Sequence, residues 1–336
     1  MLTAAEVGNL EKLRYVAHAV EEFEMKDHWV TQGDKKGRTV LHHAAIYGYM
    51  NVIEFIVKDV IDTFEDQDVR SGFLNVPDYK GRTPLFNAAV EGRVDIVRFL
   101  IQKGAIIESI TNIKHIEPGS TVLMACAEKN SVECFDMLMQ KGADILATRD
   151  DGADATYIAA RYGHLDIIKR IAEDKNMNLI VNRPTFCGRT ALITAASHGH
   201  LKVCKLLFHK GADLNHQDKS KSTALMYAAS EGYFDVVKWL VKNGANVHSK
   251  NIFQETALTC AQTKEDILDI GNWETLEMIK YLETFKKEEP DSEDNVNGVK
   301  EKSNLSKISK TGSLKILKMS SKKYFEKDFE KYFVKN

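Results

Sequence analysis

The sequence lacks the short motifs on which most enzymes depend. No stretch matches GxxxxGK[ST], GxGxxG, HExxH, GxSxG or an EF-hand loop, which hold phosphate, zinc, a nucleophilic serine or calcium. Isolated residues do not replace them, because His198, His200 and Cys204 are better explained as parts of a repeat described below. We therefore expect no enzyme activity, catalytic residue, cofactor, metal site or small-molecule substrate.

Long apolar runs and paired cysteines are missing as well. No run approaches the roughly 18–20 apolar residues that span a bilayer. The five cysteines are scattered without a CxxC pair, which favours reduced thiols over a disulfide framework. The first residues carry Glu6 and Glu11 and lack the layout of a secretory signal. These absences predict an intracellular protein, with the cytoplasm as first expectation and the cytoskeleton, cilium or nucleus left open.

What the sequence does contain is self-similarity. Seven segments are versions of one pattern: TVLHHAA (39–45), TPLFNAA (83–89), TVLMACA (121–127), DATYIAA (154–160), TALITAA (190–196), TALMYAA (223–229) and TALTCAQ (256–262). Their first residues lie 44, 38, 33, 36, 33 and 33 positions apart. A fixed period of this length is typical of repeat proteins, in which each unit stacks on the next.

The conserved chemistry of the pattern predicts a pair of helices in each unit. The leading Thr, or Asp154, can cap the free N–H groups of a first helix, and the paired Ala lets a neighbouring backbone approach closely. Three residues later a Gly, or Asn130 in one unit, permits the positive φ of a tight turn. A second apolar-periodic run such as HLDIIKRI then predicts a second helix.

These residues resemble the ankyrin repeat. Its T-P-L-H-x-A-A, Gly-His and Gly-Ala-Asp signatures appear here as TPLFNAA, Gly163-His164, Gly199-His200, and GAD at 142–144 and 211–213. The resemblance implies an all-α solenoid of stacked helix-turn-helix units with extended β-turn fingers. It also suggests that Ala4, Ala5 and Gly8 belong to an N-terminal half-repeat that precedes seven repeats.

We predict two regions. An ankyrin repeat domain covers 1–285, with repeat cores near 1–30, 37–70, 81–110, 119–148, 152–182, 188–217, 221–250 and 254–285. Insertions lengthen the chain within 58–75, 106–118 and 174–183, and they are either binding loops or tolerated spacers. Residues 286–336 form a Lys- and Ser-rich tail that we expect to be disordered.

The tail carries its own candidate site. Residues 300–336 hold 11 Lys against 4 acids, which leaves weak contact with nucleic acid or an acidic membrane open. Segment 322–335 is a candidate amphipathic helix, and its tail-docking residues are Phe325, Phe329, Tyr332 and Phe333.

The resemblance also implies where a partner protein binds, on a concave face of first helices and on the turn tips. Its concave-face positions are Ile46, Tyr47, Val90, Glu91, Glu128, Lys129, Arg161, Tyr162, His198 and Glu231. Its turn-tip positions are Lys36, Arg38, Tyr79, Lys80, Arg82, Phe186, Arg189, Lys221 and Phe253.

The first hypothesis for function is a non-enzymatic scaffold or adaptor that binds another protein, whose identity the sequence does not give. The alternatives are a structural component of a cytoskeletal or ciliary assembly, and a regulatory factor whose basic tail contacts nucleic acid or an acidic membrane. A strongly salt-dependent association of 300–336 with nucleic acid would favour the last.

Overall fold

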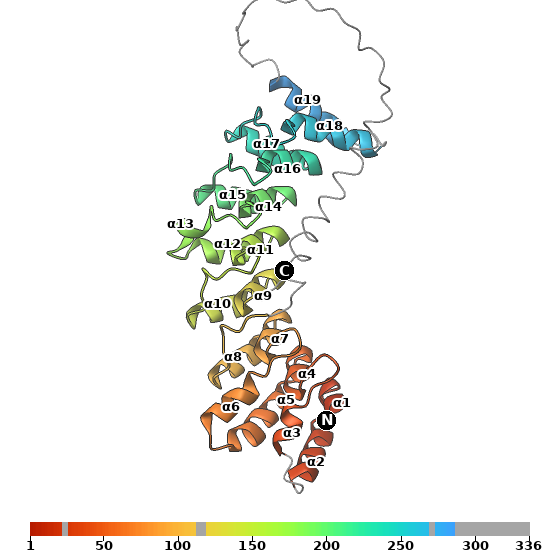
Figure 1. Cartoon of the computed structure of the whole chain (residues 1–336), viewed down its shortest axis with the longest axis vertical. Helices are drawn as coiled ribbons and strands as arrows, with labels where there is room; N and C mark the ends of the chain where they lie inside the picture. Colours follow the sequence, from red (N-terminus) through yellow and green to blue (C-terminus); the bar gives the residue numbers. More distant parts are fainter. Residues whose placement is uncertain (22–25, 112–118, 269–272, 286–336) are drawn as a thin grey trace, which may run out of the picture. The chain divides into compact units, whose positions relative to one another are not determined.

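The computed structural model describes residues 1–21, 26–111, 119–268 and 273–285 (Figure 1). They belong to one unit of the chain, Met1–Lys286. The predicted docking helix at 322–335, with Phe325, Phe329, Tyr332 and Phe333, lies outside the described residues.

Helices occur in pairs, as the repeat pattern predicts. The first helices are α1 (Leu2–Glu6), α4 (Val40–Tyr47), α7 (Pro84–Val90), α9 (Val122–Lys129), α11 (Ala155–Tyr162), α14 (Ala191–Ser197), α16 (Ala224–Glu231) and α18 (Ala257–Leu268). The second helices are α2 (Leu10–Glu21), α5 (Met50–Glu54), α8 (Val94–Gln102), α10 (Val132–Gln140), α12 (Leu165–Ala172), α15 (Leu201–His209), α17 (Phe234–Lys242) and α19 (Trp273–Glu283). Consecutive first helices contact one another, and so do the second helices from α8 onward, so the units stack in two columns (Figure 1).

Three further helical segments fall in or near the lengthened parts of the chain. Helix α3 (Lys26–Thr31) precedes the first finger, and α13 (Met177–Ile180) lies in the insertion after α12. In the second repeat, α5 continues as a π-helix (Phe55–Val60) and a 3₁₀-helix (Ile61–Thr63), which α6 (Gln67–Leu74) follows. The insertion within 58–75 is therefore helical.

The predicted helix caps are confirmed. The hydroxyl oxygen of Thr83 accepts the N–H of Phe86 at 3.2 Å, and Thr121, Thr190 and Thr223 repeat this contact. Asp154 caps α11 in the same way, accepting the N–H of Tyr157 at 2.9 Å. Each cap satisfies an N–H that the helix itself leaves free, so the leading residue of the pattern fixes where the first helix begins.

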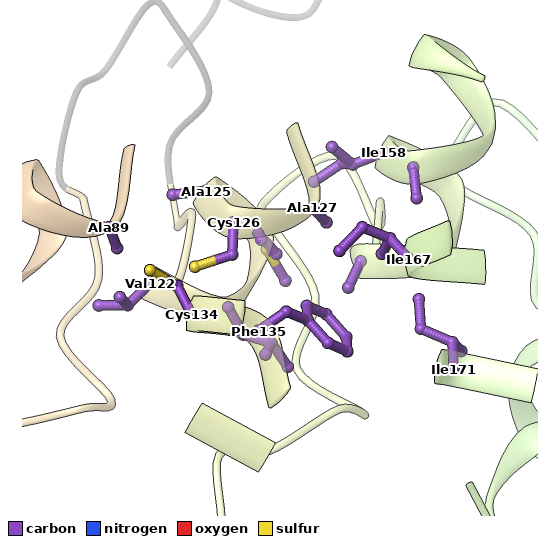
Figure 2. Close-up of a cluster of buried hydrophobic side chains, with 14 of the residues drawn as sticks. Ala89, Val122, Ala125, Cys126, Ala127, Cys134, Phe135, Ile158, Ile167 and Ile171 are labelled. Carbon is purple, nitrogen blue, oxygen red and sulfur yellow. The ribbon is translucent and has the colours of Figure 1, made fainter. Parts of the chain in front are cut away.

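The apolar slots of the pattern form one continuous core. Both Ala of the pair are buried in every repeat from α4 to α16 that has them, and Figure 2 shows the core of the fourth repeat. There Cys126 takes the place of an Ala, its sulfur lies near that of Cys134, and Phe135 fills the space beside them. Burying a ring of this size contributes roughly 1.5–3 kcal/mol. The two cysteines act as small apolar side chains, as predicted.

The turn between the two helices is covered by the following repeat. Gly163 has φ 73°, and a Cβ placed on it would lie 2.5 Å from the His200 ring. Gly199 has φ 74°, and Tyr233 covers it as closely. Glycine is therefore required here both for its backbone conformation and because the next repeat leaves no room for a side chain.

The extended turns form fingers that are linked to one another. Tyr79 N–H donates to the carbonyl oxygen of Lys36 at 2.9 Å, and the corresponding bond joins Phe186 to Asp151. One backbone bond per pair fixes neighbouring fingers side by side, which confirms the predicted β-turn fingers. None of the described helices is long and apolar enough to cross a membrane.

Candidate protein-interaction surface

The predicted concave-face residues lie together at the C-terminal ends of consecutive first helices, and we call them the first-helix row. Within it, Tyr47, Glu91, Lys129, Tyr162 and His198 are exposed, whereas Ile46, Val90, Glu128, Arg161 and Glu231 are half-buried. The row runs across the stack because the first helices contact one another in order.

A first group of rings lies at the N-terminal end of the row. Tyr47, which is 49% exposed, stacks on His43 with ring centroids 6.4 Å apart and contacts the Tyr49 ring at 6.1 Å. The buried His43 ring has a carboxylate on each side, with Glu6 at 3.4 Å and Asp34 at 3.2 Å. These neighbours hold the Tyr47 side chain in place.

A second group of rings lies in the middle of the row. Tyr162, 43% exposed, stacks on His164 at 5.8 Å, and His198 stacks on His200 at 6.1 Å. The ring N–H of His164 donates to the carbonyl oxygen of Ala127 at 2.8 Å. His200 makes the equivalent bond to the carbonyl oxygen of the preceding first helix, at 3.1 Å. The exposed rings therefore rest on rings that are fixed to the previous repeat.

Charges within the row largely satisfy one another. The Lys129 ammonium lies 3.1 Å from a Glu128 carboxylate oxygen, and this contact raises the pKa of Lys129. The Arg161 guanidinium lies 5.9 Å from the centre of the Tyr162 ring, within the range of a cation–π contact. The row is thus mainly aromatic in its exposed character, with few unpaired charges in the part just described.

The fingers share a compact turn. In the finger at 78–82, one carboxylate oxygen of buried Asp78 accepts the N–H groups of Lys80 and Arg82 at 2.8 and 2.9 Å. Asp34, Asp218 and Asn251 do the same in their fingers. The turn-tip predictions that the structure places at exposed positions are Lys36, Tyr79, Lys80, Phe186, Lys221 and Phe253.

Three predicted turn-tip residues lie instead at the base of the fingers. Arg38 points toward Asp78 in the next finger, with Nε 3.9 Å from the carboxylate. Arg82 lies over the Phe86 ring at 5.6 Å. Arg189 stacks on Tyr227 at 4.8 Å. This is a correction to their predicted position at the tips: each guanidinium folds back because an acidic or aromatic side chain on the repeat offers it a partner.

The Arg189 contact belongs to a hydrogen-bonded chain that we did not predict. Arg189 Nη2 donates to the Tyr227 hydroxyl at 2.9 Å, and that hydroxyl donates to Asp218 at 2.6 Å. Burial raises the pKa of Tyr227 to about 12, which keeps the hydroxyl a proton donor. The chain fixes two fingers to a first helix. Its sequence signal was present, since Asp218 occupies the finger position of Asp34 and Asp78.

The lengthened segments add different structures to the edge of the stack. In the insertion within 58–75, Lys103 of α8 forms an ion pair with Asp62, and the Phe64 and Phe73 rings pack at 4.9 Å. The insertion within 106–118 is described up to residue 111, where Ile110 forms an isolated antiparallel bridge with Thr121. Of the described residues, no group of three or more His, Cys, Asp or Glu could hold a metal ion.

Comparison with known families agrees with the geometry. A family model described as "Ankyrin repeats (3 copies)" matches residues 1–111, 68–149, 106–180, 123–218 and 157–251. A second, described as "Ankyrin repeats (many copies)", matches 225–283. The chain belongs to the ankyrin repeat family.

Similar curated proteins match over limited stretches. Alpha-latrotoxin-Lh1a of Latrodectus hasselti is 43% identical over 58 residues, which are 17% of this chain and 4% of the toxin. Ankyrin repeat and KH domain-containing protein CBG24701 of Caenorhabditis briggsae is 32% identical over 116 residues, 33% of this chain and 4% of that protein. Transient receptor potential cation channel subfamily A member 1 of Drosophila melanogaster is 23% identical over 192 residues, 56% of this chain and 16% of the channel. The matched part is thus a small share of each relative.

Among solved structures, the chain is similar to the ankyrin repeat domain of Bcl-3, described as a unique member of the IkappaB protein family. The TM-score is 0.54 with 24% sequence identity, and the match covers 73% of this chain and 100% of that domain. This likeness shows the fold, and ankyrin repeats are in general modules for protein–protein interaction.

Proposed function

We propose that this protein is a non-enzymatic scaffold that binds a partner protein along the first-helix row. The observation that carries the proposal is the second ring group, in which exposed Tyr162 and His198 are each held by a ring bonded to the previous repeat. Side chains fixed before binding lose little conformational entropy on binding, and tyrosine is enriched among residues that dominate binding energy.

The geometry favours a surface over a pocket. The exposed residues of the row come from separate repeats, so a partner must extend along several units to meet them. Tyr47 lies in the second repeat and Tyr162 in the fifth, and both are more than 40% exposed. An extended macromolecular partner fits this spacing better than a small molecule, which would need convergent groups in one cavity.

The test is site-specific photo-crosslinking in the cells that make the protein. A photoreactive phenylalanine analogue replaces Tyr162 in the full chain, and the matched control carries it at Leu179 of α13, which is 62% exposed on the side of the second helices. We expect a discrete protein to be captured from position 162 and not from 179. Capture of the same proteins at both positions, or of none at 162, would contradict the proposal.

A point substitution measures the energy of the contact. Changing Tyr162 to Ala should weaken the captured complex about tenfold or more, because it removes a large ring near the centre of the row. The melting temperature should hardly change, since the side chain is exposed. A large fall in melting temperature would show instead that Tyr162 supports the stack.

A further inference from the structure

The three fingers at 185–189, 218–222 and 251–255 form one edge. Lys219 N–H donates to the carbonyl oxygen of Cys187 at 3.1 Å, and Ile252 N–H donates to that of Ser220 at 3.0 Å. These bonds hold the three tips side by side. Residues exposed at successive tips can therefore meet a single bound segment.

Two of these fingers depart from the turn chemistry of the others. Lys221 has φ 58° and Gln254 has φ 62°, in the slot that holds Gly37, Gly81, Gly152 and Gly188 in the other five-residue fingers described. This left-handed conformation is strained for an L-residue, and neither Lys nor Gln has the short side chain that relieves the strain by a local hydrogen bond. Strain retained at a surface position points to a use for the side chain.

The side chains around these positions are basic. Lys219, Lys221 and Lys250 are exposed, and none of the three has an acidic partner among the described residues. The nearby acids are already bonded within the turns: Asp218 is 7% exposed, and Glu255 accepts the side-chain N–H of Asn251 at 2.9 Å. The edge therefore presents uncompensated positive charge.

Apolar side chains lie between the lysines. Phe186 is 63% exposed, Ile252 is 52% exposed and Phe253 is 59% exposed. Exposed apolar groups clustered within a charged rim are a common property of protein-binding sites. We call this set the C-terminal finger surface: Phe186, Lys219, Lys221, Lys250, Ile252 and Phe253.

We infer that the C-terminal finger surface binds an acidic segment of a partner protein, one in which Glu or Asp is interspersed with apolar residues. The inference rests on the proposed function and names the chemistry of the partner. Lysines attract the carboxylates, and the apolar side chains cover Phe186, Ile252 and Phe253.

A nucleic acid fits this surface less well. Arginine, whose planar guanidinium matches phosphate, is not free here, because Arg189 is stacked on Tyr227. The preceding finger exposes Asp150 and Asp151, and residues 1–285 carry 33 basic against 39 acidic side chains. A long polyanion would be repelled beyond the three fingers.

The experiment measures binding of three fluorescent probes to the full chain. The first is a short peptide of Glu with interspersed Leu, the second replaces its Leu with Ser, and the third is a short oligothymidylate. The first peptide should bind most tightly, and its affinity should fall with added salt because the contact is charged. Tighter binding of the oligothymidylate would replace the inference with a nucleic-acid site. Equal binding of both peptides would overturn the apolar part.

Variants locate the site. Changing Lys219 to Gln together with Lys221 to Gly should weaken binding of the Glu–Leu peptide about tenfold. The same pair should raise the melting temperature by about 1–3 °C, because Gly relieves the strained φ. Lys36→Gln, at an equally exposed finger position beside Gly37, is the matched control and should change neither quantity. Loss of binding in the control, or unchanged binding in the double variant, would overturn the assignment.

The outcome is separable from that of the proposed function. Capture at position 162 without binding of the Glu–Leu peptide would leave the scaffold standing and reject the acidic partner. Peptide binding without capture at 162 would reject the first-helix row and support the fingers.

Discussion

The second and sixth repeats solve the end of the second helix differently. In the sixth repeat, α15 ends at His209 and the chain turns at Gly211 toward the next finger. In the second repeat the chain continues through a π-helix, a 3₁₀-helix and α6 before it reaches the next finger. Yet Asp78 and Asp218 form the same turn in the two fingers that follow.

The comparison teaches where the register of the array resides. First helices contact each other in the same order on both sides of the insertion, and the neighbouring fingers are joined by the same type of backbone bond. Extra residues at the end of a second helix leave both unchanged. The first helices and fingers therefore set the register, and the ends of the second helices can vary.

The largest expected effect tests this conclusion in both regions. Ala88→Leu, beside the inserted repeat, and Ala195→Leu, in a plain repeat, should each lower the free energy of unfolding by about 2–3 kcal/mol, because both positions are fully buried between first helices. Urea unfolding of the full chain measures this. His198→Leu is the exposed control, and a silent change at Ala88 would place the register elsewhere near the insertion.

A smaller effect sharpens the comparison at the helix caps. Burial raises the pKa of Asp154 to about 6 from its ordinary 3.8, so folding favours the protonated form. The native state therefore binds more protons between pH 4 and 6, and this contribution to stability is lost as pH rises through that window. Asp154→Asn keeps a capping side chain and should gain about 1–2 kcal/mol relative to wild type at pH 7 compared with pH 4.

Thermal unfolding at several pH values measures the difference. Thr190→Ser, at the equivalent neutral cap, is the control and should show no pH dependence relative to wild type. An Asp154→Asn variant whose difference from wild type stays constant between pH 4 and 7 would contradict the burial argument.

The smallest effect concerns the insertion itself. Lys103→Ala removes the ion pair with Asp62, whose side chain is 32% exposed, and should cost about 0.5–1 kcal/mol. Lys58→Ala, which removes a more exposed pair with Glu54, should cost less. Chemical denaturation compares the two. A loss well above that of Ala88→Leu would show that the insertion carries the register after all.

The sequence was sufficient for the features that repeat. Thr83 as a cap, Asn130 in the glycine slot and the apolar role of Cys126 follow from comparing one unit with the next, because the same local geometry recurs. The family comparison and the fold agree with that prediction. Local rules were enough because each cap or turn involves residues within a few positions of one another.

The fingers were harder because their contacts join different units. Arg189 meets Tyr227, which lies 38 positions away, and no local pattern shows that this slot holds a ring in one repeat and Ala125 in another. Lys250, Ile252 and Gln254 were missed as well. Aligning NIFQE with DYKGR would have shown Gln254 in the glycine slot, which is the signal for the strained turn.

The covering of each turn gives the array a direction in time. Gly163 is covered by His200 and Gly199 by Tyr233, so the cover comes in each case from the repeat that is synthesised later. A chain that emerges from the ribosome N-terminus first can form a helix pair, but its turn stays open to water until the following pair has emerged. Growth of the native array should therefore lag synthesis by about one repeat, and each newly completed unit should protect its predecessor before it is itself protected.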